Sequence, residues 1–168
     1  VISPDGLYIA FHSYAQNLLA DNTNISYANI LLYHRTEKTF QAVNVTTSGF
    51  KPDSGVYLYC AIADEGKAVA FQSAAKNLVA DKTHSYDDIF LSVKTTDAWT
   101  IEPKGIIGGW RNDLAVAGNI AYVTEGTNVV LYDISGDTAV KRSSLSLPVE
   151  PAMIAVSGNR LYAAGSVP

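Results

Sequence analysis

Cysteine is almost absent from this sequence, since Cys60 is the only one among 168 residues. A single cysteine excludes an internal disulfide, and three scattered histidines do not supply the clustered ligands of a structural zinc site. No apolar run approaches the roughly 20 residues of a membrane-spanning helix. No signal-peptide pattern follows Val1, and a start at valine is typical of a mature chain or an excised fragment. We therefore expect no disulfide, no metal, no other cofactor and no membrane span.

Basic residues are also few. Twelve Lys and Arg stand against sixteen Asp and Glu, which gives a formal net charge of −4. Because phosphate binding needs a concentrated basic surface, this balance argues against nucleic acid as a partner. Hydrophobic residues make up 48% and charged residues 17%, so the chain has enough apolar surface to bury a core. Composition therefore indicates a folded globular segment.

Two neighbouring stretches of the sequence repeat one another. Residues 5–24 read DGLYIAFHSYAQNLLADNTN and residues 65–84 read EGKAVAFQSAAKNLVADKTH, with ten of twenty positions identical at an offset of 60. One deleted residue resets the offset to 59, and the match resumes at Ser26 and Ser85. Self-similarity at such a period indicates a repeat architecture.

A second repeat occupies the other half of the chain, where LAVAGNIAY recurs as IAVSGNRLY at an offset of 40. In both copies Gly-Asn separates two short apolar runs. Glycine at the first central position of a two-residue hairpin turn accepts the positive φ that such turns need. We therefore expect strand–turn–strand units, with positive φ at Gly118 and Gly158. Gly6 and Gly66, which precede YIAF and AVAF, are expected to do the same.

Each unit reads as four short strands, rich in Tyr, Val, Ile and Phe and separated by Gly, Asp, Asn and Ser. Units of 40–60 residues with four strands each are typical of propeller blades, whereas a two-sheet sandwich would not explain tandem repeats. The expected strands of the second unit are 56–62, 67–73, 88–93 and 99–102. Those of the third are 113–117, 120–125, 129–134 and 139–144.

These residues resemble two families of propeller repeats. SPDGLYIAF, NLLADNTN and NILLYHRTEKTF, with ADEGKAVAF, NLVADKTH and DDIFLSVKTTD, look like TolB-type, WD-like repeats of bacterial surface and secreted proteins (residues 1–103). DLAVAGNIAYVTEGTNVVLYDIS looks like the LVIVD repeat (residues 111–166). The Ser-Pro-Asp-Gly turn typical of the first family is complete at residues 3–6, while residues 63–66 keep only the glycine and an acid. The resemblance implies interaction or spacer modules.

The predicted fold is all-β, a partial β-propeller of about three and a half four-stranded blades that forms one segment over residues 1–168. Its predicted divisions are a TolB-like blade 1 at 1–54, a TolB-like blade 2 at 55–104, an LVIVD-like blade 3 at 105–147 and a partial blade 4 at 148–168. The first unit has only residues 1–3 for its innermost strand, and a closed propeller needs at least four blades.

Unfinished blades leave open sheet edges, which recruit other strands. We therefore expect a protein partner or a second copy of the chain, with the terminal strands at 154–165 meeting the opening unit of another copy. The alternatives are a monomer with frayed ends, or a piece of a longer chain.

Acidic loops are the first candidate ligands. Asp21 with its neighbours, and Asp81 with Asp87 and Asp88, offer oxygen atoms of the kind that Ca²⁺ takes. They lack the EF-hand glycine and closing glutamate, and Asp and Asn also favour turns. Because Asp21 and Asp81 are repeat equivalents, we favour a structural role in each blade over calcium binding.

The remaining candidates for chemistry are isolated residues. His12, His34 and His84 do not recur in register between the repeats, so a metal role is not favoured. Cys60 lies in the apolar run VYLYCAI, where a cysteine fills space as an inert hydrophobe. A Cys–His pair is not excluded by spacing, because such pairs form in space. We expect no catalytic, cofactor-binding or metal-binding residue.

Other short motifs have structural interpretations as well. GIIGGW at 105–110 lacks the Lys-Ser/Thr of a phosphate loop, and we expect a linker between blades, anchored by Trp110. The ten tyrosines either line a binding face or are simply favoured strand residues. Asn24-Ile25-Ser26 and Asn44-Val45-Thr46 have the form of glycosylation sequons, which are common by chance.

The functional prediction is a non-enzymatic β-propeller interaction or spacer module of an exported bacterial protein, in the periplasm or outside the cell. An alternative is the propeller part of a larger hydrolase or lyase whose catalytic residues lie outside this chain, which is an analogy by fold. A third possibility is a carbohydrate or peptide binder that acts through the funnel of a closed propeller.

Overall fold

The computed structural model of the chain describes residues 1–19, 27–46, 51–80, 82–94, 101–108, 113–136 and 138–165. Within these ranges the regular structure is β-strand apart from one 3₁₀ turn, η1 (Asp64–Gly66). None of the described segments is a helix long and apolar enough to cross a membrane. The strands are β1 (Tyr8–Ser13), β2 (Asn29–His34), β3 (Thr39–Ala42), β4 (Val56–Ile62), β5 (Ala68–Ser73), β6 (Asp88–Lys94), β7 (Ile101–Gly108), β8 (Leu114–Ala117), β9 (Ile120–Glu125), β10 (Asn128–Asp133), β11 (Val140–Ser146), β12 (Met153–Ser157) and β13 (Arg160–Ala164).

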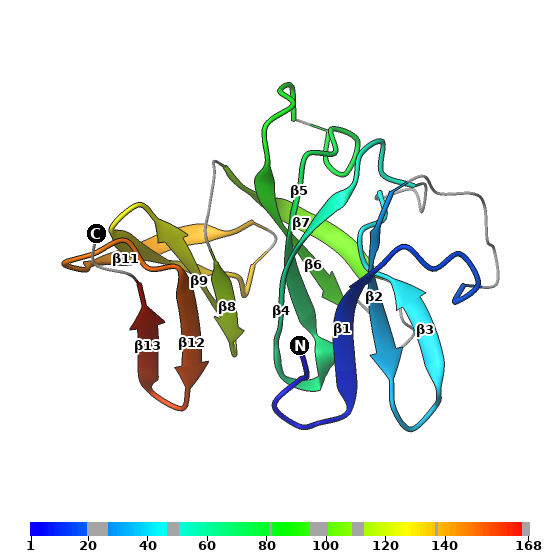
Figure 1. The fold of residues 1–168 in the computed structure, drawn as a ribbon, viewed down its shortest axis with the longest axis horizontal. Coiled ribbons are helices and arrows are strands. Elements are labelled where there is room, and N and C mark those ends of the chain that lie inside the picture. The colour runs from blue at the N-terminus through cyan, green and yellow to red at the C-terminus, as the bar shows by residue number, and fades with distance from the viewer. Residues whose placement is uncertain are drawn as a thin grey trace.

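The strands form four antiparallel groups in chain order (Figure 1). Sheet 1 is β1-β2-β3, sheet 2 is β4-β5-β6-β7, sheet 3 is β8-β9-β10-β11, and the terminal hairpin is β12-β13. Each group is a meander, in which every strand pairs with the next one along the chain. The prediction of an all-β fold is therefore confirmed. The described strands lie in an open row, and they do not close into a ring.

The first sequence repeat has the same strand register in both copies. In sheet 1, Ser13 of β1 pairs with Asn29 of β2. In sheet 2, the equivalent Ser73 of β5 pairs with Asp88 of β6, which is the pair expected from offsets of 60 and 59. Since a shift of one residue would turn every side chain to the opposite face, this identity means that the two copies present equivalent faces.

The second repeat has a matching register too. Ala117 pairs with Ile120 across the β8–β9 turn, and Ser157 pairs with Arg160 across the β12–β13 turn, at the predicted offset of 40. The prediction that both repeats are strand–turn–strand units is thus confirmed.

Glycine shapes the turns of these units. Gly118 and Gly158 have φ of 55° and 58°, as predicted, and Gly6 and Gly66 also have positive φ. Among the described non-glycine residues only Lys38 and Glu65 do so. A left-handed φ is costly for a residue with a Cβ, so these turns depend on glycine.

The turn at residues 3–6 explains the Ser-Pro-Asp-Gly motif. Ser3 N donates to Tyr8 O and Gly6 N donates to Ser3 O, while the Ser3 hydroxyl and the Asp5 carboxylate bond to each other. The main-chain bonds recur at residues 63–68, where Ala63 N donates to Ala68 O. The second copy therefore keeps the backbone turn without the Ser–Asp side-chain support.

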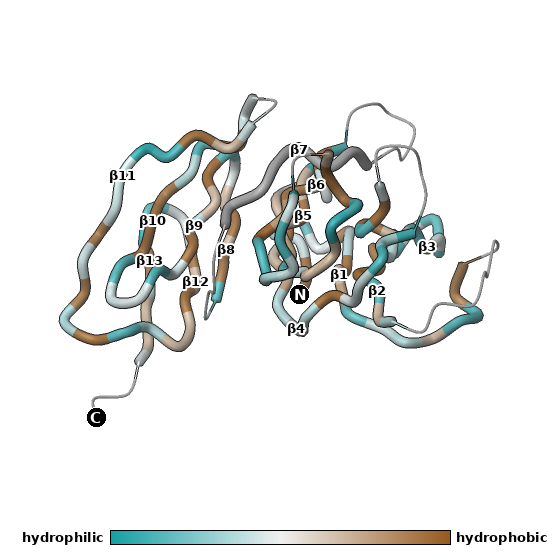
Figure 2. The backbone as a smooth tube through the Cα atoms, turned by 90° about the horizontal axis from the view of Figure 1, so that it is seen from above, coloured by the Kyte–Doolittle hydropathy of each residue, from teal (hydrophilic) through white to brown (hydrophobic). Residues whose placement is uncertain are grey.

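The core consists of layers between consecutive sheets. One buried cluster joins sheets 1 and 2, and a second joins sheets 2 and 3. Figure 2 shows the apolar segments, in brown, on the strands of the three sheets, with polar segments at many of the turns. The first strands of neighbouring groups lie side by side, because β4 packs beside β1 and β8, and β8 packs beside β12.

A carboxylate connects sheet 3 to the terminal hairpin. Asp113 Oδ2 accepts a hydrogen bond of 2.7 Å from Ile154 N, while its Oδ1 accepts one of 2.9 Å from Leu114 N. Thr124 Oγ1 holds the Asp113 backbone through bonds of 2.9 and 3.0 Å. This aspartate therefore fixes the hairpin on β8 with backbone bonds from both units.

The last strand of sheet 2 differs from its prediction. We expected a strand at 99–102 and a linker at 105–110, but β7 runs over Ile101–Gly108 and pairs with β6 along its length. The linker interpretation is wrong for residues 105–108, since the Ile-Ile pair between the glycines favours a strand and β6 offers a free edge. The strand also crosses the predicted blade boundary after residue 104. Trp110 lies outside the described residues.

The start of the chain covers the β1 edge of sheet 1. Val1 N and Val1 O both bond to Ala10, and Ile2 forms an isolated bridge with Ile9. Residues 1–3, predicted as the innermost strand of the first unit, lie beside β1 as an isolated bridge and not as a strand. Over Tyr8–Ala10 this edge is already paired, so the predicted edge contact with residues 154–165 of another copy has little free backbone to use there.

Candidate functional site: the tyrosine surface

A bulge in β4 exposes two tyrosines. Val56 pairs with Ser73 and Cys60 with Phe71, so residues 57–59 of β4 lie opposite one residue of β5. Bulges of this kind bend a strand and redirect its side chains, and they occur often beside functional sites. Tyr57 and Tyr59 are each 47% exposed, although tyrosine in a strand usually packs against a neighbouring element.

Other exposed residues gather at the same end of sheets 1 and 2. Tyr27, just before β2, packs over the backbone of Gly55, just before β4, with 3.5 Å between its Cβ and the Cβ position of that glycine. Tyr86, just before β6, is 78% exposed. We call Tyr27, Tyr57, Tyr59, Tyr86 and Asp87 the tyrosine surface. The three loop residues and the bulge come from three separate segments of the chain, so only the tertiary structure brings them together.

Asp87 ties the bulge to the loop before β6. Burial raises the pKa of the Tyr57 hydroxyl, and the negative charge of Asp87, to which Tyr57 is hydrogen-bonded, raises it further. At neutral pH the Tyr57 hydroxyl is therefore a proton donor to this carboxylate. This hydrogen bond holds the hydroxyl end of Tyr57 and leaves the ring available for contact with another molecule.

A buried ion pair supports the loop that carries Tyr86. Lys82 Nζ lies 2.8 Å from Asp88 Oδ2, and neither side chain is exposed. The same ammonium donates to Tyr86 O at 2.7 Å and to Ser73 O at 3.2 Å, and it lies 5.2 Å from the ring centre of Phe90. Lys82 thus attaches the loop to the end of β5 and the start of β6, with Tyr86 as the exposed residue of that loop.

Sequence reasoning missed Lys82, although the repeats contained a signal. Lys82 and Asp88 stand at the repeat positions of Asn22 and Asn29. Both positions carry an amide in the first repeat, and they carry opposite charges in the second. Such a joint change is expected when two residues contact each other. In sheet 1, Asn29 Oδ1 instead accepts a hydrogen bond of 3.1 Å from Asn44 Nδ2.

The acidic loop residues have other partners than those predicted. Asp88 is the first residue of β6 and is buried against Lys82, so it forms neither a turn nor an exposed calcium ligand. Asp87 bonds to Tyr57. Asp21 and Asp81 lie outside the described residues. Within the part of the chain that the structure describes, no three His, Cys, Asp or Glu side chains are grouped as a metal site would need.

The sequon at Asn44 is part of the core. Asn44 is fully buried, its Oδ1 accepts a hydrogen bond of 2.9 Å from Ile30 N, and its Nδ2 bonds to Asn29. Glycosylation needs this nitrogen to be accessible, so Asn44-Val45-Thr46 is a structural feature of the fold. The sequon at Asn24 is not among the described residues.

The three histidines lie apart. His12 and His34 are near opposite ends of β1-β2, paired with Ile30 and Tyr8, while His84 lies beside Tyr86 with 5.8 Å between ring centres. His84 Nδ1 is 3.8 Å from Asp88 Oδ2. The structure therefore places His84, among the predicted candidates, at the margin of the tyrosine surface.

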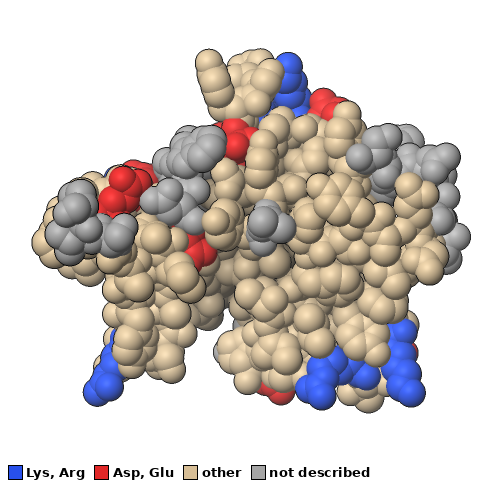
Figure 3. Space-filling view, viewed as in Figure 1, with Lys and Arg blue, Asp and Glu red and all other residues tan. Residues whose placement is uncertain are grey.

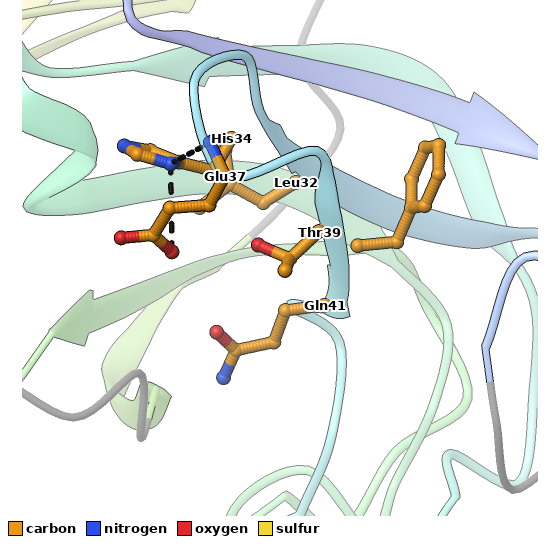
Figure 4. Close-up of a pocket in the computed structure, with 6 residues that line it drawn as sticks. Leu32, His34, Glu37, Thr39 and Gln41 are labelled. Carbon is orange, nitrogen blue, oxygen red and sulfur yellow. Dashed lines mark hydrogen bonds and ion pairs between the residues drawn. The ribbon is translucent and has the colours of Figure 1, made fainter.

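His34 lines a cavity of about 380 Å³ at the β2–β3 turn (Figure 4). Its Nδ1 accepts a hydrogen bond of 3.1 Å from Glu37 N, and the Glu37 carboxylate lies 3.5 Å from the same atom. The backbone bond uses the lone pair of Nδ1, so this ring atom is an acceptor within the turn. Of the six lining residues only His34 and Glu37 are ionisable, and both belong to one local turn.

Cys60 packs against the core between sheets 1 and 2. Burial raises the pKa of its thiol, which disfavours the nucleophilic thiolate. This placement agrees with the interpretation of Cys60 as an inert hydrophobe.

Charge does not dominate the face of the molecule in Figure 3, where most basic and acidic side chains lie toward its margins and the middle is largely uncharged.

No protein-family model matches the sequence, and no curated protein matches it as a relative.

Proposed function

We propose that this chain is a non-enzymatic interaction module of an exported bacterial protein, and that it binds a protein partner through the tyrosine surface. The observation that carries the proposal is the β4 bulge, which holds Tyr57 and Tyr59 half exposed opposite a single residue of β5. Tyrosine is enriched at protein interfaces and among the residues that contribute most to binding energy.

Rigid support favours this role. Lys82 and Asp88 fix the loop of Tyr86, Gly55 lies under Tyr27, and Asp87 holds the Tyr57 hydroxyl. Side chains that are already ordered lose little conformational entropy when a partner binds, and this makes the interaction stronger.

We also propose that the three sheets and the terminal hairpin are consecutive β-propeller blades of the TolB and LVIVD types. The identical registers of the repeats and the side-by-side first strands support this assignment. In a propeller, loops at one end of the sheets form a continuous surface, and the tyrosine surface lies at such an end.

Site-specific photo-cross-linking tests the proposed function. A benzophenone amino acid at position 86 of the protein in its native host should give one discrete heavier adduct after irradiation. The control places the same amino acid at Leu145, an exposed apolar residue of β11.

The bulge provides a second arm of that experiment. Tyr57→Ala in the position-86 protein should reduce the adduct at least fivefold, while Tyr162→Ala, another exposed tyrosine, should leave it unchanged. Equal labelling from positions 86 and 145, or an adduct that is insensitive to Tyr57→Ala, would refute a partner site at the tyrosine surface.

A further inference from the structure

A polar block of side chains lines the cavity at the β2–β3 turn. Leu32 pairs with Gln41 and His34 pairs with Thr39, and all four residues line this cavity of about 380 Å³. Cross-strand partners lie on one face of a sheet, as do alternate residues of one strand. Figure 4 accordingly shows these side chains, with that of Glu37 from the turn, on one side of the hairpin.

This face of the hairpin is the one that packs on sheet 2. Leu32 is buried in the cluster that joins sheets 1 and 2, and Tyr8, the partner of His34 on β1, belongs to the same cluster. The rings of Tyr8 and His34 lie 4.6 Å apart. The apolar layer therefore reaches Leu32 and Tyr8, and beyond them the same face continues as polar side chains around the cavity.

The second repeat builds the equivalent place from apolar residues. Val93 is the repeat equivalent of His34 at the offset of 59, and it packs against the cluster between sheets 2 and 3. Leu91, two residues before it, is buried in that cluster and pairs with Gly105, where β3 has Gln41. The strand pairing of such a unit therefore does not require an imidazole or an amide at these positions.

Polar side chains that are partly buried cost free energy unless hydrogen bonds compensate. The side chain of His34 is only 13% exposed, and Gln41 is half-buried. Because the second repeat has Val93 and Gly105 at these places, strand pairing alone does not explain the polar residues of sheet 1. The cavity is also of a suitable size, since small-molecule sites usually have volumes of about 300–1,000 Å³.

The lining residues restrict the chemistry of a ligand. Among the described residues around the cavity there is no Lys or Arg, although Arg35 and Lys38 belong to the same turn. Arg35 Nη1 instead donates to Gly6 O at 2.6 Å. The carboxylate of Glu37 lies 3.5 Å from His34 Nδ1 and is the negative group of the wall. A phosphate or a carboxylate would therefore meet negative charge without a Lys or Arg to bind it.

Hydroxyl groups match what the wall offers. The Thr39 hydroxyl donates and accepts, the Gln41 amide does both through separate atoms, and the Glu37 carboxylate accepts. A sugar hydroxyl also donates and accepts, so adjacent hydroxyls of one ring can bond to neighbouring groups of this wall. Cross-strand partners stand about 4.5–5.5 Å apart at Cβ, which is within the reach of a single ring. Leu32 supplies an apolar surface for the C–H groups of that ring.

We propose that this cavity binds one residue of a neutral carbohydrate, with Glu37, Thr39 and Gln41 as hydrogen-bond partners of its hydroxyl groups. The cavity lies at the end of β2, whereas Tyr27 lies before its start. The carbohydrate site is therefore separate from the tyrosine surface, and it does not depend on the proposed protein partner.

Nuclear magnetic resonance of the isotope-labelled 168-residue chain tests the site. Glucose, galactose, mannose and N-acetylglucosamine are the separate probes. At least one of them should shift the amide signals of residues 32–41 with a dissociation constant in the millimolar range, and should leave those of β9 and β10 unchanged.

Variants of the wall show whether its polar groups bind the sugar. Thr39→Ala and Gln41→Ala each remove a hydrogen-bond partner and should weaken binding by about threefold or more. Thr127→Ala, at an exposed threonine of the β9–β10 turn, is the matched control and should bind as the parent does. His34→Val introduces the residue of the second repeat and should abolish binding. Urea unfolding verifies that each variant is folded, and His34→Val keeps the test decisive if Gln41→Ala does not fold.

The proposal is overturned if none of the four sugars shifts the signals of residues 32–41 at about 50 mM, a concentration that saturates a millimolar site. It is also overturned if His34→Val and Gln41→Ala bind the sugar as tightly as Thr127→Ala does. Ethylammonium is the competing probe. If it shifts these signals and the sugars do not, the cavity is a cation site at Glu37 and the carbohydrate assignment is wrong.

Discussion

Lys82 and Asp88 form a fully buried ion pair with 2.8 Å between nitrogen and oxygen, at a position where the first repeat uses amides. Desolvating two charges offsets much of their attraction, so such a pair says little about net stability. The pair does fix the position of the neighbouring loop, because the Lys82 ammonium also donates a hydrogen bond to the backbone oxygen of Tyr86. The loop of the tyrosine surface is therefore fixed by a buried charge and not by apolar packing alone.

Removal of one member of this pair should be strongly destabilising. Lys82→Met leaves the Asp88 carboxylate buried without its cation, and we expect a loss of about 3–5 kcal/mol in the free energy of unfolding. The double variant Lys82→Asn/Asp88→Asn, which introduces the residues of the first repeat, should recover part of that loss. Urea unfolding measures both.

The exposed pair of Glu65 and Lys67 is the control for this experiment. Both side chains are largely exposed, so Lys67→Met should change stability by less than about 1 kcal/mol. If Lys82→Met and Lys67→Met had equal effects, the buried pair would have no special role.

A side chain at either of the two turn glycines should lower the free energy of unfolding. Gly118→Val and Gly158→Val each force a β-branched residue to positive φ, and we expect losses above about 1 kcal/mol, beyond the propensity effect. No atom lies within 4 Å of either Cβ position, so the loss measures backbone strain without collision. Gly136→Val, at a glycine without positive φ, is the control in the same melting experiment; matching Tm values for all three would argue against the turn geometry.

Asp113 should hold the terminal hairpin. Asp113→Ala removes the acceptor of the Ile154 and Leu114 bonds, and hydrogen bonds to a charged group contribute about 1.5–3 kcal/mol each. In the variant, hydrogen exchange should therefore be faster than in the parent at the amides of β12 and β13, and much less changed at those of β5 and β6. Uniform acceleration over all strands would mean that the hairpin unfolds only with the rest of the molecule.

Acid should weaken a contact at the end of β10. The Ser135 hydroxyl and amide, followed by the Arg142 guanidinium, hold the pKa of Asp133 well below its ordinary value near 3.8. A depressed folded-state pKa contributes stability that is present above the unfolded pKa and is lost as the pH falls toward the folded one. The stability difference between the parent and Asp133→Asn should therefore be largest near pH 7 and shrink below about pH 4.

That difference is measured by urea midpoints at several pH values. Ser135→Ala, which removes the largest of these contacts, should reduce the difference at pH 7. A gap between parent and Asp133→Asn that widens in acid would contradict the assignment.

Much of the fold could be read from local patterns. The predicted strands at 56–62 and 120–125 match β4 and β9 residue for residue, and the two glycine turns occur where expected. These features depend on alternation of side chains and on the φ of single residues, which are encoded within a few positions. The β7 prediction was wrong because its glycines suggest a loop, while pairing with β6 is a long-range contact.

The candidate site was less predictable. Tyrosine was a candidate binding residue from composition, but the sequence did not distinguish Tyr57 and Tyr59 from tyrosines such as Tyr8, which is buried in the core. The bulge that exposes the first two follows from the pairing of β4 with β5, and no local pattern within β4 signals it.

By itself the sequence determined the repeats, the turn glycines and the register of equivalent strands, because each depends on spacing along the chain. Only the tertiary structure decided that Lys82 contacts Asp88, that Asn44 is buried and that three segments meet at the tyrosine surface. It also decided which sheet faces are covered, since burial depends on the neighbouring sheet. A strand carries its alternation wherever it lies, whereas the exposure of each side chain is set by what packs against it.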